Sequence, residues 1–339
     1  MEALLDETPG KMAVILAGDI GGTNTRLGLF GREAGPLTLV ATRTYPSREY
    51  ESLGAIIDKF VAEHPEPVSA ACLAIAGPVS NGRVATTNLA WVVDSERVAH
   101  RLGLTGVQLI NDLEAIGHGL SELGPEDIAT LAPGAPGTQG NRAIVAAGTG
   151  LGEAGCYWDG REHQPFACEG GHADFAPRDD LEIELLRHLR KRFDRVSYER
   201  VVSGVGLLEL YKFLHETGRG AEDSALTETI YRQGHPAPIV RAALDGRSER
   251  CSMALDRFIS IYGAEAGNLG LKLMARGGIY IGGGIAPRII ERLRQPAFLS
   301  SLTSKGRMTP LLESMPVHVI LNDKVGLLGA AHHTARRTA

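Results

Sequence analysis

The chain has 339 residues, of which 43% are hydrophobic and 22% charged, and its formal net charge is −5. This length is enough for two lobes with separate cores, and the composition is that of a soluble globular protein. The acidic balance and scattered Lys and Arg residues argue against a nucleic-acid partner, and no apolar run approaches the roughly 20 residues of a membrane-spanning helix.

The amino-terminal segment and the cysteines indicate a cytoplasmic protein. Residues 1–7 are too acidic and too poor in apolar side chains for a signal peptide. Cys72, Cys156, Cys168 and Cys251 lie far apart in the sequence, which favours reduced, buried thiols over a disulfide framework. We therefore expect free thiols and a cytoplasmic location.

The first motif is an apolar run, a turn of Gly, Thr and Asn residues, and a second apolar run, over residues 14–30. It predicts a β-hairpin whose turn can bind phosphate. Gly21 and Gly22 let the backbone approach a ligand and adopt φ values barred to other residues, so that N–H groups and the Thr23 hydroxyl converge on one anion. Asp19 is left for a cation. An ordinary glycine-containing hairpin is the alternative interpretation.

A second copy of this pattern covers residues 143–158, with Gly148, Thr149 and Gly150 in the turn. Two such hairpins, one in each half, indicate a duplicated α/β unit. The pairing resembles the actin, Hsp70 and sugar-kinase group, in which phosphate lies between two such hairpins. Neither turn continues as the Gly-Lys-Ser/Thr of a P-loop, and neither opens a helix as a dinucleotide fingerprint does. The expected ligand is therefore ATP, bound without a Walker motif.

Strands and helices alternate after the first hairpin, which predicts a mainly parallel sheet with its ligands beyond the carboxyl ends of the strands. Asn111 and Asp112 stand at such a strand end, just before a helix. The periodicity predicts strands at 37–43, 70–76 and 107–110, and helices at 53–61, 95–102 and 112–120.

The second half is predicted to be rich in helices and to contain a third glycine loop. Gly283 and Gly284 lie between a strand at 279–281 and a short helix, where bare backbone can lie against a purine or ribose. A purely structural strand-to-helix turn is the alternative. Further expected elements are a loop at 131–141, helices beginning at 179 and covering 203–214, 237–244 and 252–274, a strand at 317–320 and a last helix at 324–334.

A set of acidic, amide and histidine residues has the chemistry of a sugar site, because each sugar hydroxyl both donates and accepts hydrogen bonds. The set consists of Asn111, Asp112, Glu169, His172 and Glu199, with Asn88 as a further candidate. A helix cap at 111–112 and solvated surface charges are the alternative interpretations. A zinc site at 169–172 is disfavoured, because Cys168 has no second ligand at the required spacing.

Seven motifs then occur in the order seen in bacterial ATP-dependent glucokinases, which the chain resembles from about residue 12 to its last helix. They are DIGGTNTR (19–26), AGPV (76–79), TNLAW (87–91), LIND (109–112), GTGLG (148–152), EGGH (169–172) and ERVVSG (199–204).

The resemblance implies a two-lobed α/β fold of the actin and hexokinase type, a duplicated ribonuclease H-like unit with ATP and sugar in the cleft between the lobes. We expect a small domain over 12–122, completed by a C-terminal segment at about 318–339, and a larger, helix-rich domain over 123–317. A homodimer is also implied.

The resemblance also assigns roles to residues. Asn111, Asp112, Glu169, His172 and Glu199 would hold glucose, and Asp112 would be the general base. Asp19 would orient Mg²⁺, directly or through water. The residues expected to bind ATP are Gly18, Asp19, Gly21, Gly22, Thr23, Asn24, Gly148, Thr149, Gly150, Gly283 and Gly284. No structural zinc is expected, since residues 173–177 replace the Cys-x-Cys-Gly element that the wider sugar-kinase and repressor group carries after its Gly-His pair.

Transfer of the γ-phosphoryl of ATP to the 6-hydroxyl of glucose is thus the leading hypothesis. A kinase for another hexose, or one using another phosphoryl donor, is the first alternative. A sugar-sensing regulator would need a helix-turn-helix, and only about a dozen residues precede the first strand. A nucleotide-dependent chaperone or filament protein is disfavoured by the sugar-type polar set.

Overall fold

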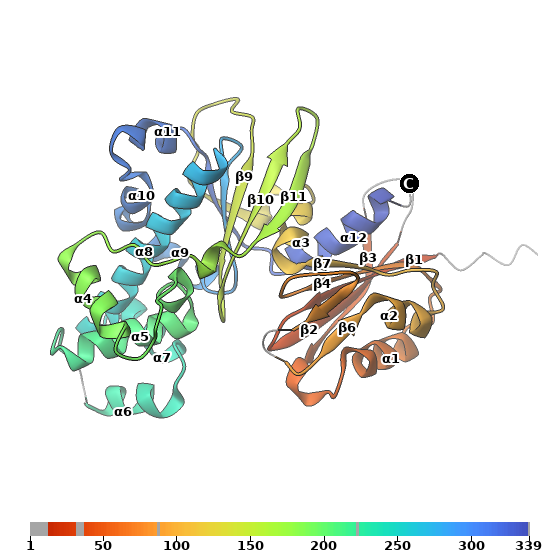
Figure 1. The fold of residues 1–339 in the computed structure, drawn as a ribbon, viewed down its shortest axis with the longest axis horizontal. Coiled ribbons are helices and arrows are strands. Elements are labelled where there is room, and N and C mark those ends of the chain that lie inside the picture. Colours follow the sequence, from red (N-terminus) through yellow and green to blue (C-terminus); the bar gives the residue numbers. More distant parts are fainter. Residues whose placement is uncertain (1–12, 32–36, 87–88, 222–223, 338–339) are drawn as a thin grey trace, which may run out of the picture. The chain divides into compact units, whose positions relative to one another are not determined.

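The computed structural model describes residues 13–31, 37–86, 89–221 and 224–337 (Figure 1). The chain forms two compact units. The first combines the residues up to Leu123 with those from Lys324 onward, and the second runs from Gly124 to Asp323.

The first unit is built on a mixed five-stranded sheet in the order β3-β2-β1-β4-β7. The two predicted strands of the first hairpin pair antiparallel, whereas β1, β4 and β7 run parallel. A separate pair, β5 and β6, forms a small antiparallel sheet. The strands are β1 (Val14–Ile20), β2 (Asn24–Gly31), β3 (Thr38–Pro46), β4 (Val68–Ile75), β5 (Arg83–Ala85), β6 (Val92–Asp94) and β7 (Gln108–Asn111).

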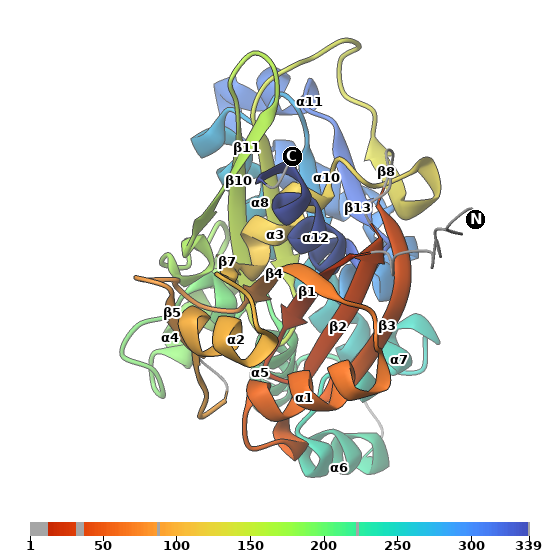
Figure 2. The same ribbon diagram turned by 90° about the vertical axis from the view of Figure 1, so that its right-hand side faces the viewer.

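Helices cover both faces of this sheet because its central strands are apolar on both sides (Figure 2). In β1, Leu16 and Ile20 face the core shared with α1 and α2, whereas Ile15 and Ala17 face α3 and α12. Because successive side chains of a strand point to opposite faces of the sheet, β1 contributes residues to two cores. The helices are α1 (Leu53–Glu63), α2 (Ser95–Leu102), α3 (Asp112–Gly119) and α12 (Val325–Arg337), with a 3₁₀ turn, η1 (Ser47–Glu49).

The second unit repeats the same strand arrangement. Its six-stranded sheet has the order β11-β10-β9-β12-β13-β8, and its first four pairings are antiparallel, antiparallel, parallel and parallel, as in the first unit. This repetition confirms the predicted duplication. The strands are β8 (Ile128–Ala132), β9 (Arg142–Ala147), β10 (Leu151–Trp158), β11 (His163–Cys168), β12 (Ile279–Gly282) and β13 (Val317–Ile320).

The prediction of a mainly parallel sheet is wrong for both units. Only two pairings in each of the two large sheets are parallel, since the three strands that open each repeat are joined directly to one another and must pair antiparallel. Parallel pairing begins only after the first crossover, at β4 and at β12.

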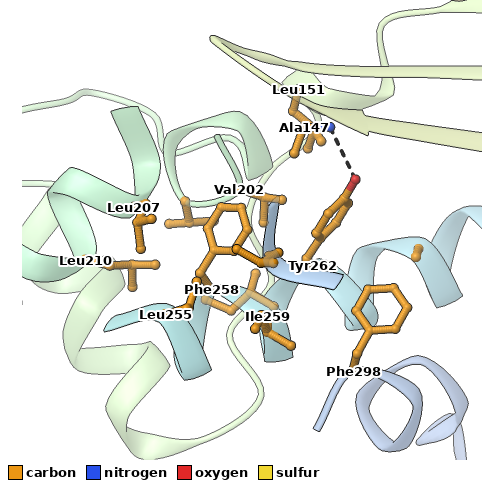
Figure 3. Packing of buried hydrophobic residues seen from close by; sticks show 14 of the residues in the cluster. Ala147, Leu151, Val202, Leu207, Leu210, Leu255, Phe258, Ile259, Tyr262 and Phe298 are labelled. Atoms are coloured by element: carbon orange, nitrogen blue, oxygen red, sulfur yellow. Dashed lines mark hydrogen bonds between the residues drawn. The ribbon is translucent and has the colours of Figure 1, made fainter. Parts of the chain in front are cut away.

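The core of the second unit is organised around α8, the longest helix, as Figure 3 shows. Phe258, Ile259 and Tyr262 of α8 are essentially fully buried, and burial of each such side chain contributes about 1.5–3 kcal/mol. The helices are α4 (Asp180–Leu189), α5 (Gly204–Glu216), α6 (Ser224–Gln233), α7 (Ala237–Leu244), α8 (Glu249–Leu273), α9 (Ile290–Leu293), α10 (Pro296–Thr303) and α11 (Thr309–Glu313). The 3₁₀ turns are η2 (Pro125–Asp127), η3 (Gly170–His172), η4 (Tyr198–Arg200), η5 (Ala286–Ile289) and η6 (Gly306–Met308).

The chain returns to the first unit at Lys324, later than the expected position of about 318. The reason is β13, which pairs with both β12 and β8 and therefore belongs to the second sheet. All four cysteines are free, as expected. No helix in the described part of the chain is long and apolar enough to cross a bilayer.

Candidate functional site

The strand ends of the first unit bring part of the predicted polar set to one edge of the sheet. Ile20 of β1 pairs with Ile75 of β4, and Ile75 pairs with Asn111 of β7. The carboxyl ends of three parallel strands are therefore level, and the phosphate-type turn after β1 lies at the same edge as Asn111. Sequence reasoning placed ligand-binding residues at this edge.

Asn111 and Asp112 have different structural roles. The Asn111 side chain is buried and caps α3, because its Oδ1 accepts the N–H groups of Leu113 and Glu114 at 2.9 and 3.3 Å. Its Nδ2 donates to the Gly77 carbonyl. Asp112 is the first residue of the helix and does not serve as the cap. The helix-cap interpretation thus applies to Asn111 alone.

The turn after β1 is closed by neutral groups. The Gly21 N–H donates to the Asn24 carbonyl at 2.9 Å, and Ser47 in η1 donates its N–H to the Thr23 carbonyl. The Ser47 hydroxyl donates to the Gly21 carbonyl at 2.8 Å and lies 2.9 Å from the Thr25 hydroxyl. The Gly21 amide is therefore engaged within the turn.

Asp19 is half-buried near the end of β1, where it faces the first turn of α12. A Cβ built on Gly326 would lie 3.5 Å from one carboxylate oxygen of Asp19, so α12 approaches this carboxylate closely. A carboxylate is a suitable ligand for Mg²⁺, which usually keeps several of its waters. Gly18 lies inside β1 against Leu73, so its lack of a side chain serves packing.

The turn between β9 and β10 is held by a carboxylate. Oε2 of Glu199 accepts the Leu151 N–H at 3.1 Å, and a Cβ on Gly150 would lie only 2.4 Å from the same oxygen. The Gly148 N–H donates to the Gly150 carbonyl, and the Gly148 carbonyl accepts the Gly204 N–H. The Gly148 amide is therefore engaged within the turn itself.

Glycines in these turns are not needed for unusual backbone angles, contrary to the expectation. Gly21, Gly148 and Gly150 all have φ outside the left-handed region. What differs among them is space. A Cβ on Gly148 would meet nothing within 4 Å, so this glycine leaves its surroundings open to a ligand.

The three predicted sugar-binding residues of the second unit lie together on two adjoining turns, η3 and η4. Nε2 of His172 lies 3.9 Å from Oε2 of Glu169, and its Nδ1 lies 4.0 Å from Oε1 of Glu199. The Glu169 and His172 side chains are 60% and 53% exposed and the Glu199 side chain 31%, so all three remain open to a ligand. Glu199 connects this group directly to the turn after β9.

The third glycine loop lies against the end of β9. Gly283 has φ of +79°, and a Cβ there would lie 2.2 Å from the Ala147 carbonyl oxygen, so only glycine fits. The loop forms a strand-to-helix turn between β12 and η5, which is the structural alternative, and it also lies beside the turn that Gly148 begins. A Cβ on Gly284 would meet nothing within 4 Å.

Tyr262 of α8 joins the two strands that lead into these loops, a role that the sequence analysis did not find. Its hydroxyl accepts the Ala147 N–H at 3.2 Å, as drawn in Figure 3, and lies 3.0 Å from the Val145 carbonyl and 3.3 Å from the Gly282 carbonyl. Burial raises the pKa of this hydroxyl, so it stays a donor at neutral pH. An isolated tyrosine in an apolar helix carried no sequence signal for this position.

Two further expectations concern residues 87–88 and metal binding. Asn88 lies outside the described residues. Within the described ranges, no three His, Cys, Asp or Glu side chains are grouped so that they could hold a metal ion. In the segment that replaces the cysteine element, Asp174 pairs with Arg195 at 3.0 Å.

The chain is a sugar kinase of the actin-like ATPase fold. Its two α/β units share one strand order, and each contains a glycine hairpin. Beside the second hairpin lie the acidic residues and the histidine that were predicted to bind sugar. The sequence profile described as glucokinase matches residues 16–337. The chain belongs to the glucokinase family.

Known glucokinases agree with this assignment. The glucokinase of Trichormus variabilis is 42% identical, over 96% of this chain and all of its own length. The crystal structure of a glucokinase from an Antarctic psychrotroph has a TM-score of 0.81 and 32% identity, covering 95% of this chain and 99% of that one. A ROK family glucokinase from Streptomyces griseus, solved in complex with glucose and AMPPNP, shares the fold with a TM-score of 0.64 at 21% identity, covering 96% and 100% of the two chains.

Proposed function

We propose that this protein phosphorylates glucose, transferring the γ-phosphoryl of ATP to the 6-hydroxyl to give glucose 6-phosphate and ADP for glycolysis. The observation that carries the proposal is the double contact of Glu199. One of its oxygens holds the turn after β9 through the Leu151 N–H, and the other faces His172. The names of the relatives, and the glucose and AMPPNP bound to the Streptomyces griseus protein, support the choice of substrates.

Sugar recognition is assigned to Asn111, Asp112, Glu169, His172 and Glu199. Carboxylates, an amide and an imidazole together offer acceptors and donors to adjacent hydroxyls, which fixes the orientation of the ring. Hydrogen bonds to charged groups contribute about 1.5–3 kcal/mol each, so a small number of them suffices for specific binding.

Asp112 is assigned as the general base. It stands at the first position of α3, where the aligned peptide dipoles favour a negative charge. Because Asn111 already caps the helix, the Asp112 carboxylate is not needed for that purpose. It would take the proton of the 6-hydroxyl as this oxygen attacks the γ-phosphorus.

The phosphates of ATP are assigned to the glycine turns and to the hydroxyls of Thr23 and Thr149. Of the backbone amides, those of Gly21 and Gly148 are excluded, since both donate within their own turns. Asp19 would hold Mg²⁺, directly or through water, and this ion would neutralise charge on the β- and γ-phosphates. Phosphoryl transfer asks the protein chiefly to position these groups and stabilise charge.

A coupled ADP-release assay tests the proposal. Purified protein with Mg²⁺ is given a panel of hexoses, with ATP, ADP or polyphosphate as the phosphoryl donor. We expect ATP and glucose to give the highest kcat/KM. A higher value for another hexose or another donor would replace the proposed substrate pair, and no turnover with any pair would refute kinase activity.

We also propose a cytoplasmic homodimer without structural zinc. The cytoplasm supplies ATP, and dimerisation follows the family resemblance. Light scattering that gives the monomer mass of 36.1 kDa across micromolar concentrations would contradict the dimer. Elemental analysis that finds one zinc ion per chain would contradict the proposed absence of structural zinc.

A further inference from the structure

A glutamate without any hydrogen-bond donor lies beneath the sugar-binding turns. Glu153 is on β10, its residue surface is only 1% exposed, and its neighbours along the strand are apolar or small. Among the described residues, neither of its carboxylate oxygens has a hydrogen-bond partner. An ionised carboxylate in such a place is strongly disfavoured, because burial removes its hydration and nothing replaces it.

A second buried glutamate, Glu265 of α8, lies beside the first. Its Oε2 accepts the Asn268 side-chain amide at 2.8 Å, and Lys272 lies 3.7 Å from Oε1. The Tyr198 hydroxyl is also within hydrogen-bonding reach. Its Oε1 has no hydrogen bond among the described residues. Glu265 is thus equipped to be ionised, and Glu153 is not.

A single proton on Glu153 would reduce the cost of burying the two glutamates together. A protonated Glu153 can donate to the Oε1 atom of Glu265, which gives one oxygen of each group a hydrogen-bond partner. Burial, and after it the nearby Glu265 carboxylate, raises the pKa of Glu153 to about 8. A pKa of about 8 keeps the proton on Glu153 at neutral pH.

Glu153 contacts the turn that carries Glu169 and His172. A Cβ on Gly170 would lie 1.9 Å from Oε2 of Glu153, so the Gly170 backbone rests directly on the carboxyl group. Glu153 is also paired along the strand with Cys168, just before this turn.

Glu265 reaches the other turn. Tyr198 immediately precedes Glu199 in η4, and its hydroxyl lies within reach of Glu265 and accepts from Asn268 at 3.0 Å. Asn268 in turn accepts from the Lys305 ammonium. The two carboxyl groups therefore adjoin both turns of the sugar-binding group from below.

We propose that one proton shared by Glu153 and Glu265 holds these two turns in place, so that glucose affinity is lost when the proton dissociates. Glu153 is then a positioning residue and touches no substrate. The inference rests on the proposed function, and it deepens that function by adding a source of pH dependence.

Other groups around the pair do not replace this proton. Burial raises the pKa of Glu265 as well, whereas Lys272 and Lys305 favour its charge. Burial also raises the pKa values of the three neutral acids nearby. The groups facing the pair are Lys272, Lys305, Tyr198, Tyr262 and Cys168.

The test is the glucose dissociation constant of the whole protein, measured calorimetrically without ATP from pH 6.5 to 9.5. For the natural sequence we expect a constant value below pH 8 and a rise of about tenfold by pH 9, the result of losing one proton. In Glu153→Gln the side-chain amide donates to Glu265 without titrating, so the curve should be flat.

Glu182→Gln is the matched control, because Glu182 is also fully buried in the second unit but is held by ion pairs with Arg178 and Arg257. The alkaline rise should persist in this variant. The same rise in Glu153→Gln as in the natural sequence, or no rise in the natural sequence, would overturn the inference.

A second measurement separates this inference from the proposed function and does not depend on a variant that folds. Because the pKa of Glu153 is raised in the folded state, the stability that its proton supplies is complete below the ordinary glutamate range and is lost as the pH rises through about 8. An infrared band of a buried protonated carboxyl should be present at pH 7 and lost by pH 9.5. If the band is present but the protein binds no glucose, the proposed function is refuted and the shared proton is supported. If the band is absent at pH 7, the shared proton is refuted.

Discussion

The turn between β1 and β2 and the turn between β9 and β10 occupy equivalent positions in sheets of the same strand order, yet different chemistry holds them. The first is held by the hydroxyl of Ser47, a buried and neutral group. The second is held by the carboxylate of Glu199, a partly exposed residue that we assign to glucose. In both, the first glycine donates its N–H within the turn.

The difference separates a fixed turn from a turn that responds to a ligand. Ser47 is buried, so a ligand at the surface would not contact the hydroxyl that donates to Gly21. Glu199 shares its charge between the Leu151 N–H and whatever approaches its other oxygen. Glucose bound to Glu199 would therefore alter the hydrogen bond that shapes the second turn, whereas the first turn would be insensitive to glucose.

The largest expected effect is on catalysis and concerns Asp112, which is not needed as a helix cap because Asn111 caps α3. Asp112→Asn keeps the size of the side chain but cannot accept a proton, so kcat should fall by about 10²–10⁴. The capping bonds of α3 should persist, because Asn111 makes them, and loss of a charge at the helix start should cost about 0.3–1 kcal/mol of stability. Steady-state kinetics and denaturant unfolding check both statements. A variant that retains more than a tenth of the original kcat would refute the assignment.

Gly148 gives the cleanest probe of the second turn. Its φ is ordinary and a Cβ meets nothing within 4 Å, so Gly148→Ala should fold normally. The methyl group would displace bound phosphate, and a misplacement of about 1 Å can reduce kcat/KM for ATP by about 100-fold.

Gly150→Ala serves as the comparison for Gly148→Ala. Its Cβ would collide with Glu199, so glucose binding should suffer as well. Unchanged ATP kinetics in Gly148→Ala would remove this turn from the nucleotide site.

The pair Glu199→Gln and Glu169→Gln tests whether one carboxylate serves two ligands. Each change removes a charge-assisted hydrogen bond to the sugar, so kcat/KM for glucose should fall by about 10- to 100-fold in both. Only Glu199→Gln also weakens the bond to the Leu151 N–H. The KM for ATP should therefore rise about fivefold in that variant alone, the difference between charged and neutral hydrogen bonds. Equal ATP kinetics in the two variants would refute the claim that Glu199 couples glucose binding to the second turn.

Local patterns were sufficient to predict the elements that carry the site. Both hairpins, the third glycine loop and the strand before Asn111 were found because apolar runs and glycine turns are local signals. Glu169, His172 and Glu199 were proposed from their chemistry and assigned to glucose by the family resemblance, since residues 27 to 30 positions apart show no periodicity that would join them.

What the sequence did not reveal depends on contacts between distant segments. Tyr262 lies 115 residues from the amide that it accepts from, and Ser47 lies 26 residues from the carbonyl to which it donates. Edge strands β8 and β11 were missed, because their mixed exposure gives no clean alternation. One signal was available and not used, namely Glu153, an acidic residue inside an otherwise apolar strand.

The smallest expected effect belongs to Ser47→Ala, and it tests the fixed turn directly. The substitution removes the hydroxyl that donates to the Gly21 carbonyl but keeps two backbone bonds, from Gly21 to Asn24 and from Ser47 to Thr23. Because a neutral hydrogen bond contributes about 1 kcal/mol net, the free energy of unfolding should fall by about that amount.

The kinetics of Ser47→Ala should stay within about twofold of the original, since the remaining backbone bonds preserve the turn. Thr25→Val is the control, because it removes the hydroxyl beside Ser47 and leaves the bond to Gly21 in place. It should therefore cost less stability than Ser47→Ala. If Ser47→Ala instead lost tenfold or more in kcat/KM for ATP at nearly unchanged stability, the first turn would depend on its side-chain partner as the second does.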